Sequence, residues 1–168
     1  LPYLSRILGS DGIGIYSYVV AITAYFILVG TLGLNLYGQK EIAYVQDDEY
    51  LRSKKFYEIF ILKTFTLTIS LIFFYIFFAS GGKYANFYKI LIIEIIGNIF
   101  DITWFFQGLE EFKKTVIRNS AIKLISTFLI FILIKKYEDL HLYFWIYAIS
   151  IFLGNLSMWF YLPKYIKK

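Results

Sequence analysis

The sequence predicts an all-α protein whose helices cross a membrane several times, and composition and the spacing of charges are the observations that predict it. Of the 168 residues, 59% are hydrophobic and 17% are charged, whereas soluble domains contain about 45–50% apolar and about 25% charged residues. A helix needs roughly 20 mostly apolar residues to cross a bilayer core about 30 Å thick. Three uncharged runs of 28, 19 and 24 residues meet that need, at 12–39, 64–82 and 140–163.

Five spans are predicted, at about residues 13–37, 64–82, 87–107, 116–134 and 142–162. The first, second and fifth lie within the uncharged runs. The third contains Lys89, Glu94 and Asp101, and the fourth contains Arg118 and Lys123. Charged side chains at such depth usually face a bundle interior or a watery cavity. We therefore expect these two spans to be the ones that carry function.

The start of the chain predicts a helix end rather than a natural N-terminus. Residues 1–8 have the character of the last part of a further helix, which the turn sequence Gly9-Ser10-Asp11-Gly12 would terminate. Leu1 is not an initiator methionine, and no basic region precedes an apolar core, so a signal peptide is not expected. We expect the sequence to be a fragment of a longer protein.

Basic residues are distributed unequally between the two sets of alternate loops. Cytoplasmic loops of membrane proteins are enriched in Lys and Arg. Twelve of the 17 basic residues lie on one side, in the segment from Lys40 to Lys63, in the stretch after the third span and in the tail with Lys164, Lys167 and Lys168. This distribution predicts that the segment 40–63, the connection 110–114 and the C-terminus are cytoplasmic.

The net charge of +5 does not predict a nucleic-acid partner, because in a chain this apolar basic residues are typical of loops beside membrane helices. The chain contains no cysteine, which excludes disulfides and thiolate metal sites within it. His141 is the only histidine and no further ligands accompany it, so we expect no metal site. No Ser–His–Asp arrangement favours nucleophilic catalysis.

Two spans carry polar residues at helical spacing. The members of each set fall at i, i+4 and i+7: Glu94, Asn98 and Asp101 on the third span, and Asn119, Lys123 and Ser126 on the fourth. This spacing places each set on one helical face. At about 1.5 Å per residue, Asp101 and Lys123 both lie roughly 9–10 Å from the cytoplasmic end, so we predict that they approach each other.

Two interpretations of these polar faces stay open. The charges form an ion pair that only allows two charged helices to insert, or the faces line an aqueous cavity. In the cavity, a carboxylate would take up a proton or a sodium ion and a cation would attract an anionic substrate. Asn35 and Asn155 stand alone in apolar helices, and we interpret them as interhelical hydrogen-bond partners rather than substrate contacts.

Three motifs occur in order along the chain: PYLSRILG at 2–9 followed by GIGIY at 12–16, LG at 32–33 followed by YGQKEIA at 37–43 and an acidic pair at 47–48, and DITWFFQGLEEFK at 101–113 leading to Arg118-Asn119. In these motifs the chain resembles the bacterial polysaccharide flippases for O-antigen and capsule repeat units, within the MATE-like exporter superfamily.

The resemblance implies a transporter of roughly twelve to fourteen helices in two lobes, not an enzyme. Residues 1–168 would form its N-terminal lobe without most of the first helix. The implied substrate is an oligosaccharide repeat unit on polyprenyl diphosphate, moved by alternating access to the outer leaflet of the bacterial cytoplasmic membrane for cell-surface polysaccharide synthesis. The implied partners are the missing C-terminal lobe, membrane lipid, and polysaccharide polymerase and chain-length proteins.

A diphosphate calls for Arg or Lys facing a cavity between the lobes. The candidates here are Arg6, Lys40, Arg118 and Lys123. Glu94 and Asp101 are candidate acids for coupling to H⁺ or Na⁺, with no other cofactor expected, and the candidate polar lining comprises Asn98, Asn119 and Ser126.

Other functions stay open from the sequence alone. An ion-coupled exporter of drugs or teichoic acid belongs to the same superfamily. A membrane glycan polymerase or ligase would also be polytopic, but such enzymes generally need a sizeable outer loop with catalytic polar residues, and the predicted outer loops are short. A non-transporting assembly subunit is a further alternative.

Overall fold

The structure is a computed structural model that describes residues 2–166, and within that range it is helical without strands. Leu1 and the predicted tail residues Lys167 and Lys168 lie outside the described residues. Five helical segments are long and apolar enough to cross a membrane: Tyr3–Thr31, Glu49–Ala79, Ala85–Gly108, Phe112–Leu133 and Tyr137–Lys164. The all-α class and the five spans are therefore confirmed, and the chain is a multi-pass membrane protein.

Helix α1 (Pro2–Thr31) is bent where the sequence predicts a turn. Gly9 has φ 66° and ψ −180°, a backbone conformation that glycine adopts readily, and helix lies on both sides of it. The predicted turn at 9–12 is thus wrong in extent, because a single residue makes the bend. The part of α1 before Gly9 packs on the far end of α6 (Phe112–Leu133), where the Tyr3 hydroxyl donates to Ile134 O at 2.8 Å.

Helix α1 ends at Thr31, before the predicted end of the first span at residue 37. Leu32 and Gly33 have φ of 46° and 73°, and such left-handed residues end a helix. The next helix, α2 (Leu34–Tyr44), follows at once. The predicted boundary is wrong because the absence of charge continues through the break.

Helix α3 (Glu49–Phe74) begins well before the predicted start of the second span at residue 64. The Asp48 carboxylate caps it by accepting the Leu51 N–H at 2.9 Å, as Asp often does at an N-terminus. The helix continues as the π-helical segment η1 (Tyr75–Ala79). The segment 40–63, predicted as a connection, is therefore largely helical.

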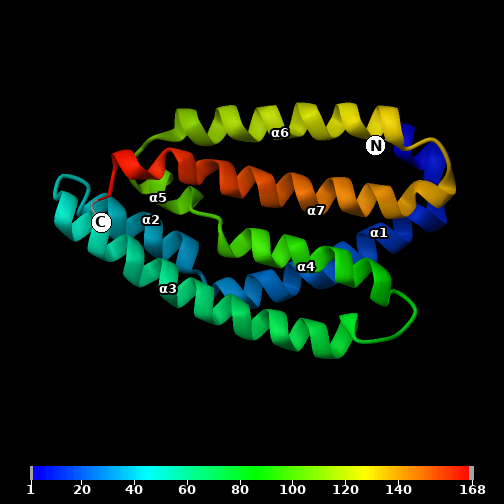
Figure 1. Ribbon diagram of the computed structural model, residues 1–168, viewed down its shortest axis with the longest axis horizontal. Coiled ribbons are helices and arrows are strands. Elements are labelled where there is room, and N and C mark those ends of the chain that lie inside the picture. The colour runs from blue at the N-terminus through cyan, green and yellow to red at the C-terminus, as the bar shows by residue number, and fades with distance from the viewer. Residues whose placement is uncertain (1, 167–168) are drawn as a thin grey trace.

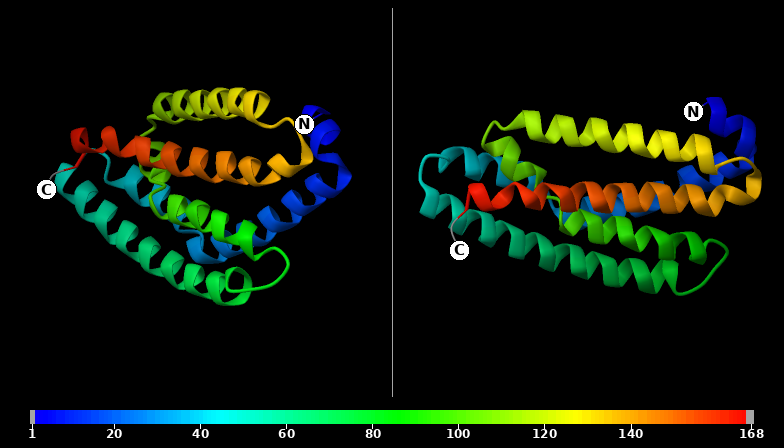
Figure 2. Two further views of the ribbon diagram at one scale, coloured as in Figure 1. Left: turned by 45° about the vertical axis from the view of Figure 1, so that its right-hand side comes forward. Right: turned by 45° about the horizontal axis from the view of Figure 1, so that its top comes forward.

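The third predicted span is two helices, α4 (Ala85–Ile99) and α5 (Thr103–Gly108), with a break at 100–102. Helix α7 (Leu140–Ser157) is preceded by the 3₁₀ turn η2 (Tyr137–Asp139) and followed by η3 (Met158–Phe160) and η4 (Leu162–Lys164). Helices α6, α7, α4 and α3 follow one another across the bundle, with α1 crossing behind them (Figure 1). Helix α6 forms the edge, which the two turned views in Figure 2 also show.

Two buried clusters hold the helices together. The larger one joins α1, α3, α4 and α7. At Gly97 of α4, a Cβ atom would lie 3.0 Å from the Cα of Phe152 on α7, and such small residues allow close helix packing in membranes. The smaller cluster lies where α2, α3, α5, η3 and η4 meet, and there Trp104 of α5 stacks on Phe56 of α3 with ring centroids 5.7 Å apart.

Candidate functional site

The break between α4 and α5 positions the site. A helix that ends inside a membrane leaves carbonyl groups that need other partners. Three side chains supply them: Asn155 Nδ2 donates to Gly97 O at 2.9 Å, Trp159 Nε1 to Phe100 O at 2.8 Å, and Lys63 Nζ to Asp101 O at 2.8 Å. Beyond the break, the Asp101 carboxylate accepts the backbone N–H of Thr103 at 3.0 Å. Side chains from α3, α7 and η3 thus fix the break in place.

The ionic partner of Asp101 is Lys63 of α3. Lys63 is fully buried, and its ammonium lies 4.0 Å from Asp101 Oδ2. Among residues 2–166 no ion pair joins Asp101 to Lys123, so the predicted approach of these two residues is wrong. Lys63 borders an uncharged run, so the spacing of charges alone predicts that it lies in a connection. A comparison of depths between the third and fourth predicted spans therefore does not include it.

A cavity of about 580 Å³, here called the central cavity, lies beside the break. Residues of α1, α2, α4, α5, α6 and α7 line it. Its polar lining comprises Thr31, Asn35, Glu94, Asn98, Asp101, Thr103, Trp104, Gln107, Arg118 and Asn155. The structure thus brings together four predicted site residues from two spans: Glu94, Asn98, Asp101 and Arg118.

Arg118 is held by two neighbouring elements. Its Nη1 donates to Asn155 Oδ1 at 2.7 Å and its Nη2 donates to Thr103 Oγ1 at 3.0 Å. Asn155 therefore bridges α6 and α4, which confirms its interpretation as an interhelical hydrogen-bond partner. These bonds orient the guanidinium before any ligand arrives, and that reduces the entropy lost on binding.

Glu94 is the buried acid of the central cavity, with 5% of its surface exposed. Its Oε1 accepts the Tyr147 hydroxyl at 2.9 Å. Asn98, one turn further along α4, donates from Nδ2 to the Glu94 backbone oxygen at 2.9 Å. Tyr147 lies in an apolar run of α7, and nothing in its sequence surroundings indicates this role.

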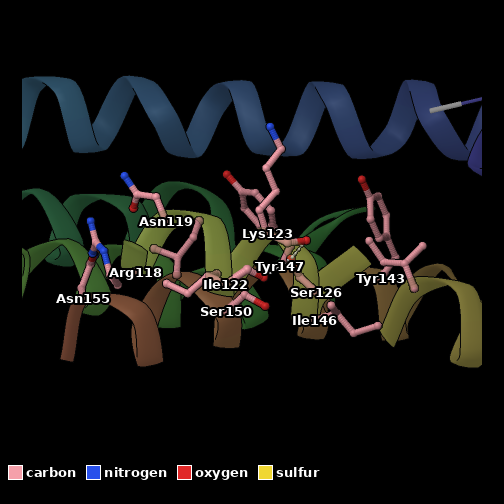
Figure 3. Close-up of a pocket in the computed structure, with 12 residues that line it drawn as sticks. Arg118, Asn119, Ile122, Lys123, Ser126, Tyr143, Ile146, Tyr147, Ser150 and Asn155 are labelled. Carbon is pink, nitrogen blue, oxygen red and sulfur yellow. Dashed lines mark hydrogen bonds between the residues drawn. The ribbon is translucent and has the colours of Figure 1, made fainter. Parts of the chain in front are cut away.

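A second cavity of about 320 Å³, here called the side cavity, lies between α6 and α7. Its lining includes Arg118, Asn119, Lys123 and Ser126 (Figure 3). Lys123 is exposed, and its amino group points away from the Arg118–Asn155 pair in Figure 3. The Ser126 hydroxyl donates to Ile122 O of its own helix at 2.7 Å. Arg118, Ile151 and Asn155 line both cavities and so form their common boundary.

Two predicted cationic candidates lie away from both cavities. Arg6 is exposed on the part of α1 before Gly9. Lys40 is exposed on α2, with its ammonium 5.8 Å from the centroid of the Tyr44 ring. Neither residue belongs to the lining of the central or the side cavity.

The connection between α5 and α6 carries a small polar cluster near Arg118. The Glu111 carboxylate accepts hydrogen bonds from Lys114 Nζ and from the Tyr165 hydroxyl, each at 2.8 Å. These two bonds lower the pKa of the Glu111 carboxyl below its ordinary value. The cluster attaches the first turn of α6 to the segment after η4.

Comparison with known proteins supports the family resemblance that the three motifs indicate. The profile of the polysaccharide biosynthesis protein family matches residues 1–168, the whole chain. The chain belongs to this family. No solved structure matches it.

Two curated relatives of this family member are each named a putative O-antigen transporter. The one from Shigella dysenteriae is 29% identical over 160 residues, which are 94% of this chain and 38% of the relative. The one from Escherichia coli K12 is 27% identical over 142 residues, which are 83% of this chain and 34% of the relative. The chain thus spans less than two fifths of the length of either relative, and both relatives are named as transporters rather than enzymes.

Proposed function

We propose that the protein containing this chain translocates oligosaccharide repeat units linked to polyprenyl diphosphate across the bacterial cytoplasmic membrane, for cell-surface polysaccharide synthesis. The observation that carries the proposal is the family match over residues 1–168, together with two relatives named as putative O-antigen transporters. Polar cavities among apolar helices support it, because a polar cargo needs a polar path through the membrane. We further propose that the chain is one lobe of a two-lobe transporter that works by alternating access.

Arg118 and Lys123 are the proposed diphosphate contacts. Both line the side cavity, and Lys123 is exposed with no ion-pair partner among residues 2–166. A free ammonium and an oriented guanidinium suit a phosphate group. Glu94 and Asp101 remain the proposed acids for coupling to H⁺ or Na⁺, and polymerase and chain-length proteins remain proposed partners.

Transfer of a lipid-linked oligosaccharide between leaflets, measured with the complete protein in vesicles, tests this function. We expect Lys123→Glu to slow transfer about tenfold or more, because a charged hydrogen bond to phosphate is replaced by repulsion. Lys54→Glu is the matched control, since Lys54 lies on α3 away from both cavities.

Vesicles with the unaltered protein that transfer no lipid-linked glycan, but export organic cations, would contradict the proposal and favour the drug exporter. Unchanged transfer by Lys123→Glu would remove that residue from the diphosphate site and leave the function standing.

A further inference from the structure

The central cavity gathers polar atoms that the protein itself leaves unbonded. Four buried side-chain atoms have no hydrogen-bond partner among residues 2–166: Asn35 Oδ1, Glu94 Oε2, Trp104 Nε1 and Arg118 Nε. All four residues line the central cavity. Glu94 and Trp104 are themselves 5% and 1% exposed. Buried polar groups are nearly always hydrogen-bonded, so their convergence from α2, α4, α5 and α6 indicates a ligand site.

The four atoms differ in hydrogen-bonding character. Asn35 Oδ1 and Glu94 Oε2 accept, whereas the Trp104 indole and Arg118 Nε donate. A diphosphate only accepts hydrogen bonds, and a metal ion has no acceptor to offer the two N–H groups. A hydroxyl group both donates and accepts. A ligand with several hydroxyl groups can therefore satisfy all four atoms.

The charges around the central cavity favour a neutral ligand. The carboxylates of Glu94 and Asp101 face the cavity together with the guanidinium of Arg118. Lys63 stands behind Asp101, within 4.0 Å of its carboxylate. Two acidic groups are thus balanced by two basic groups, so the site attracts neither an anion nor a cation by net charge. Its volume of about 580 Å³ lies within the range of about 300–1,000 Å³ that small-molecule sites occupy.

We propose that the central cavity binds a neutral sugar unit of the cargo, with its hydroxyl groups bonded to Asn35, Glu94, Trp104 and Arg118. This inference rests on the proposed function and refines it. The sugar lies in the central cavity, while the diphosphate lies with Lys123 in the side cavity. Arg118 lines both cavities. Its Nε has no partner among residues 2–166, and each terminal nitrogen, bonded once to Asn155 or Thr103, carries a second N–H that is available to the diphosphate.

Binding of two lipid probes to the complete protein tests the sugar site. One probe is polyprenyl diphosphate carrying a neutral hexose oligosaccharide, and the other is polyprenyl diphosphate without sugar. Trp104→Phe keeps an aromatic ring and removes the N–H donor. We expect it to weaken binding of the glycan probe about three- to tenfold and to leave binding of the sugar-free probe unchanged.

Trp145→Phe is the matched control, because Trp145 is 42% exposed on α7 and does not line the central cavity. This variant should bind both probes as the unaltered protein does. If Trp104→Phe leaves the affinity for both probes unaltered, the sugar assignment is wrong. Equal weakening of both probes would also contradict the assignment, because the sugar-free probe has no hydroxyl groups of a sugar to lose.

Glu94→Gln separates the sugar from other occupants by the sign of its effect. The substitution keeps the shape of the side chain, replaces an acceptor oxygen with a donor and removes a negative charge. A bound sugar predicts weaker binding of the glycan probe only. A diphosphate in the central cavity predicts tighter binding of both probes, and a sodium ion predicts loss of Na⁺ dependence with unchanged probe affinities; either result overturns the proposal. If the unaltered protein binds neither probe, the proposed function itself fails.

Discussion

Lys63 is a charged residue whose main partner is the protein backbone. Its ammonium lies 2.8 Å from Asp101 O but 4.0 Å from Asp101 Oδ2. The closer contact is therefore a carbonyl that the helix break leaves unpaired. A positive charge just beyond the C-terminal end of α4 also interacts favourably with the helix dipole. We infer that Lys63 stabilises the break first and neutralises Asp101 second.

Replacing Lys63 by Met should destabilise the complete protein by about 3 kcal/mol, because it leaves a partly buried carboxylate and a carbonyl without their cation. Thermal unfolding in detergent measures this loss, and Lys54→Met on the same helix, with an exposed side chain, should change little. Adding Asp101→Asn to Lys63→Met should restore only part of the stability, since Asp101 O stays unpaired. Complete recovery would instead assign the whole effect to the ion pair.

The residues that sequence could place are those whose position depends on helical period alone. Glu94, Asn98 and Asp101 share a face at i, i+4 and i+7 and do line one cavity. Lys63 and Trp104 could not be placed in this way. Their positions depend on which helix packs against the break, and a periodic pattern within one helix carries no information about its neighbours.

The short helices α2 and α5 form a close pair at the end of the bundle that holds Trp104. A Cβ atom at Gly38 of α2 would lie 2.5 Å from Trp104 Cε3. Trp104 is 1% exposed and stacked on Phe56, so the ring has no space into which it could move. The position of Trp104 in the lining of the central cavity therefore depends on Gly38, although Gly38 lines neither the central nor the side cavity.

Gly38→Val should destabilise the protein by about 1–3 kcal/mol through overpacking and should also weaken glycan binding by displacing Trp104. Thermal unfolding and the glycan probe measure the two effects. Gly14→Ala on α1 is the control, because a Cβ there meets nothing within 4 Å and alanine favours helix. Equal behaviour of the two variants would show that the contact between α2 and α5 does not position Trp104.

Helix existence was predictable, and helix ends were not. Uncharged runs show where a chain can lie in lipid, but Leu32 and Gly33 end α1 inside such a run, and the Asp48 cap starts α3 outside one. The local signals for both were present, a glycine and an N-terminal Asp. A search for uncharged runs alone does not detect these two signals.

At the scale of the whole molecule, alternate connections gather at opposite ends. The connections 45–48 and 109–111 lie at the same end as η4, and the connections 80–84 and 134–139 lie at the other end (Figure 1). This arrangement agrees with the predicted division of the connections into one set that is rich in Lys and Arg and one that is poor in them. Because Lys63 lies in the bundle rather than in a connection, it no longer counts toward the basic side. The other basic residues of that side still outnumber the five on the opposite side.

Labelling of single cysteines from outside intact cells checks both the crossing and its direction, and the absence of cysteine from this chain leaves only those elsewhere in the complete protein to be replaced. Asp47 and Gly81 are exposed and flank α3 and η1. Because one span separates them, Asp47→Cys and Gly81→Cys must react from opposite sides, whichever way the protein is inserted. The basic excess near Asp47 decides the direction.

We therefore expect an impermeant maleimide to label Gly81→Cys in intact cells and Asp47→Cys only after permeabilisation, with Glu138→Cys in η2 behaving like Gly81→Cys. Labelling of both Asp47→Cys and Gly81→Cys from outside would show that α3 does not cross the membrane, and the reverse pattern would invert the orientation and place the Lys114 end of α6 outside.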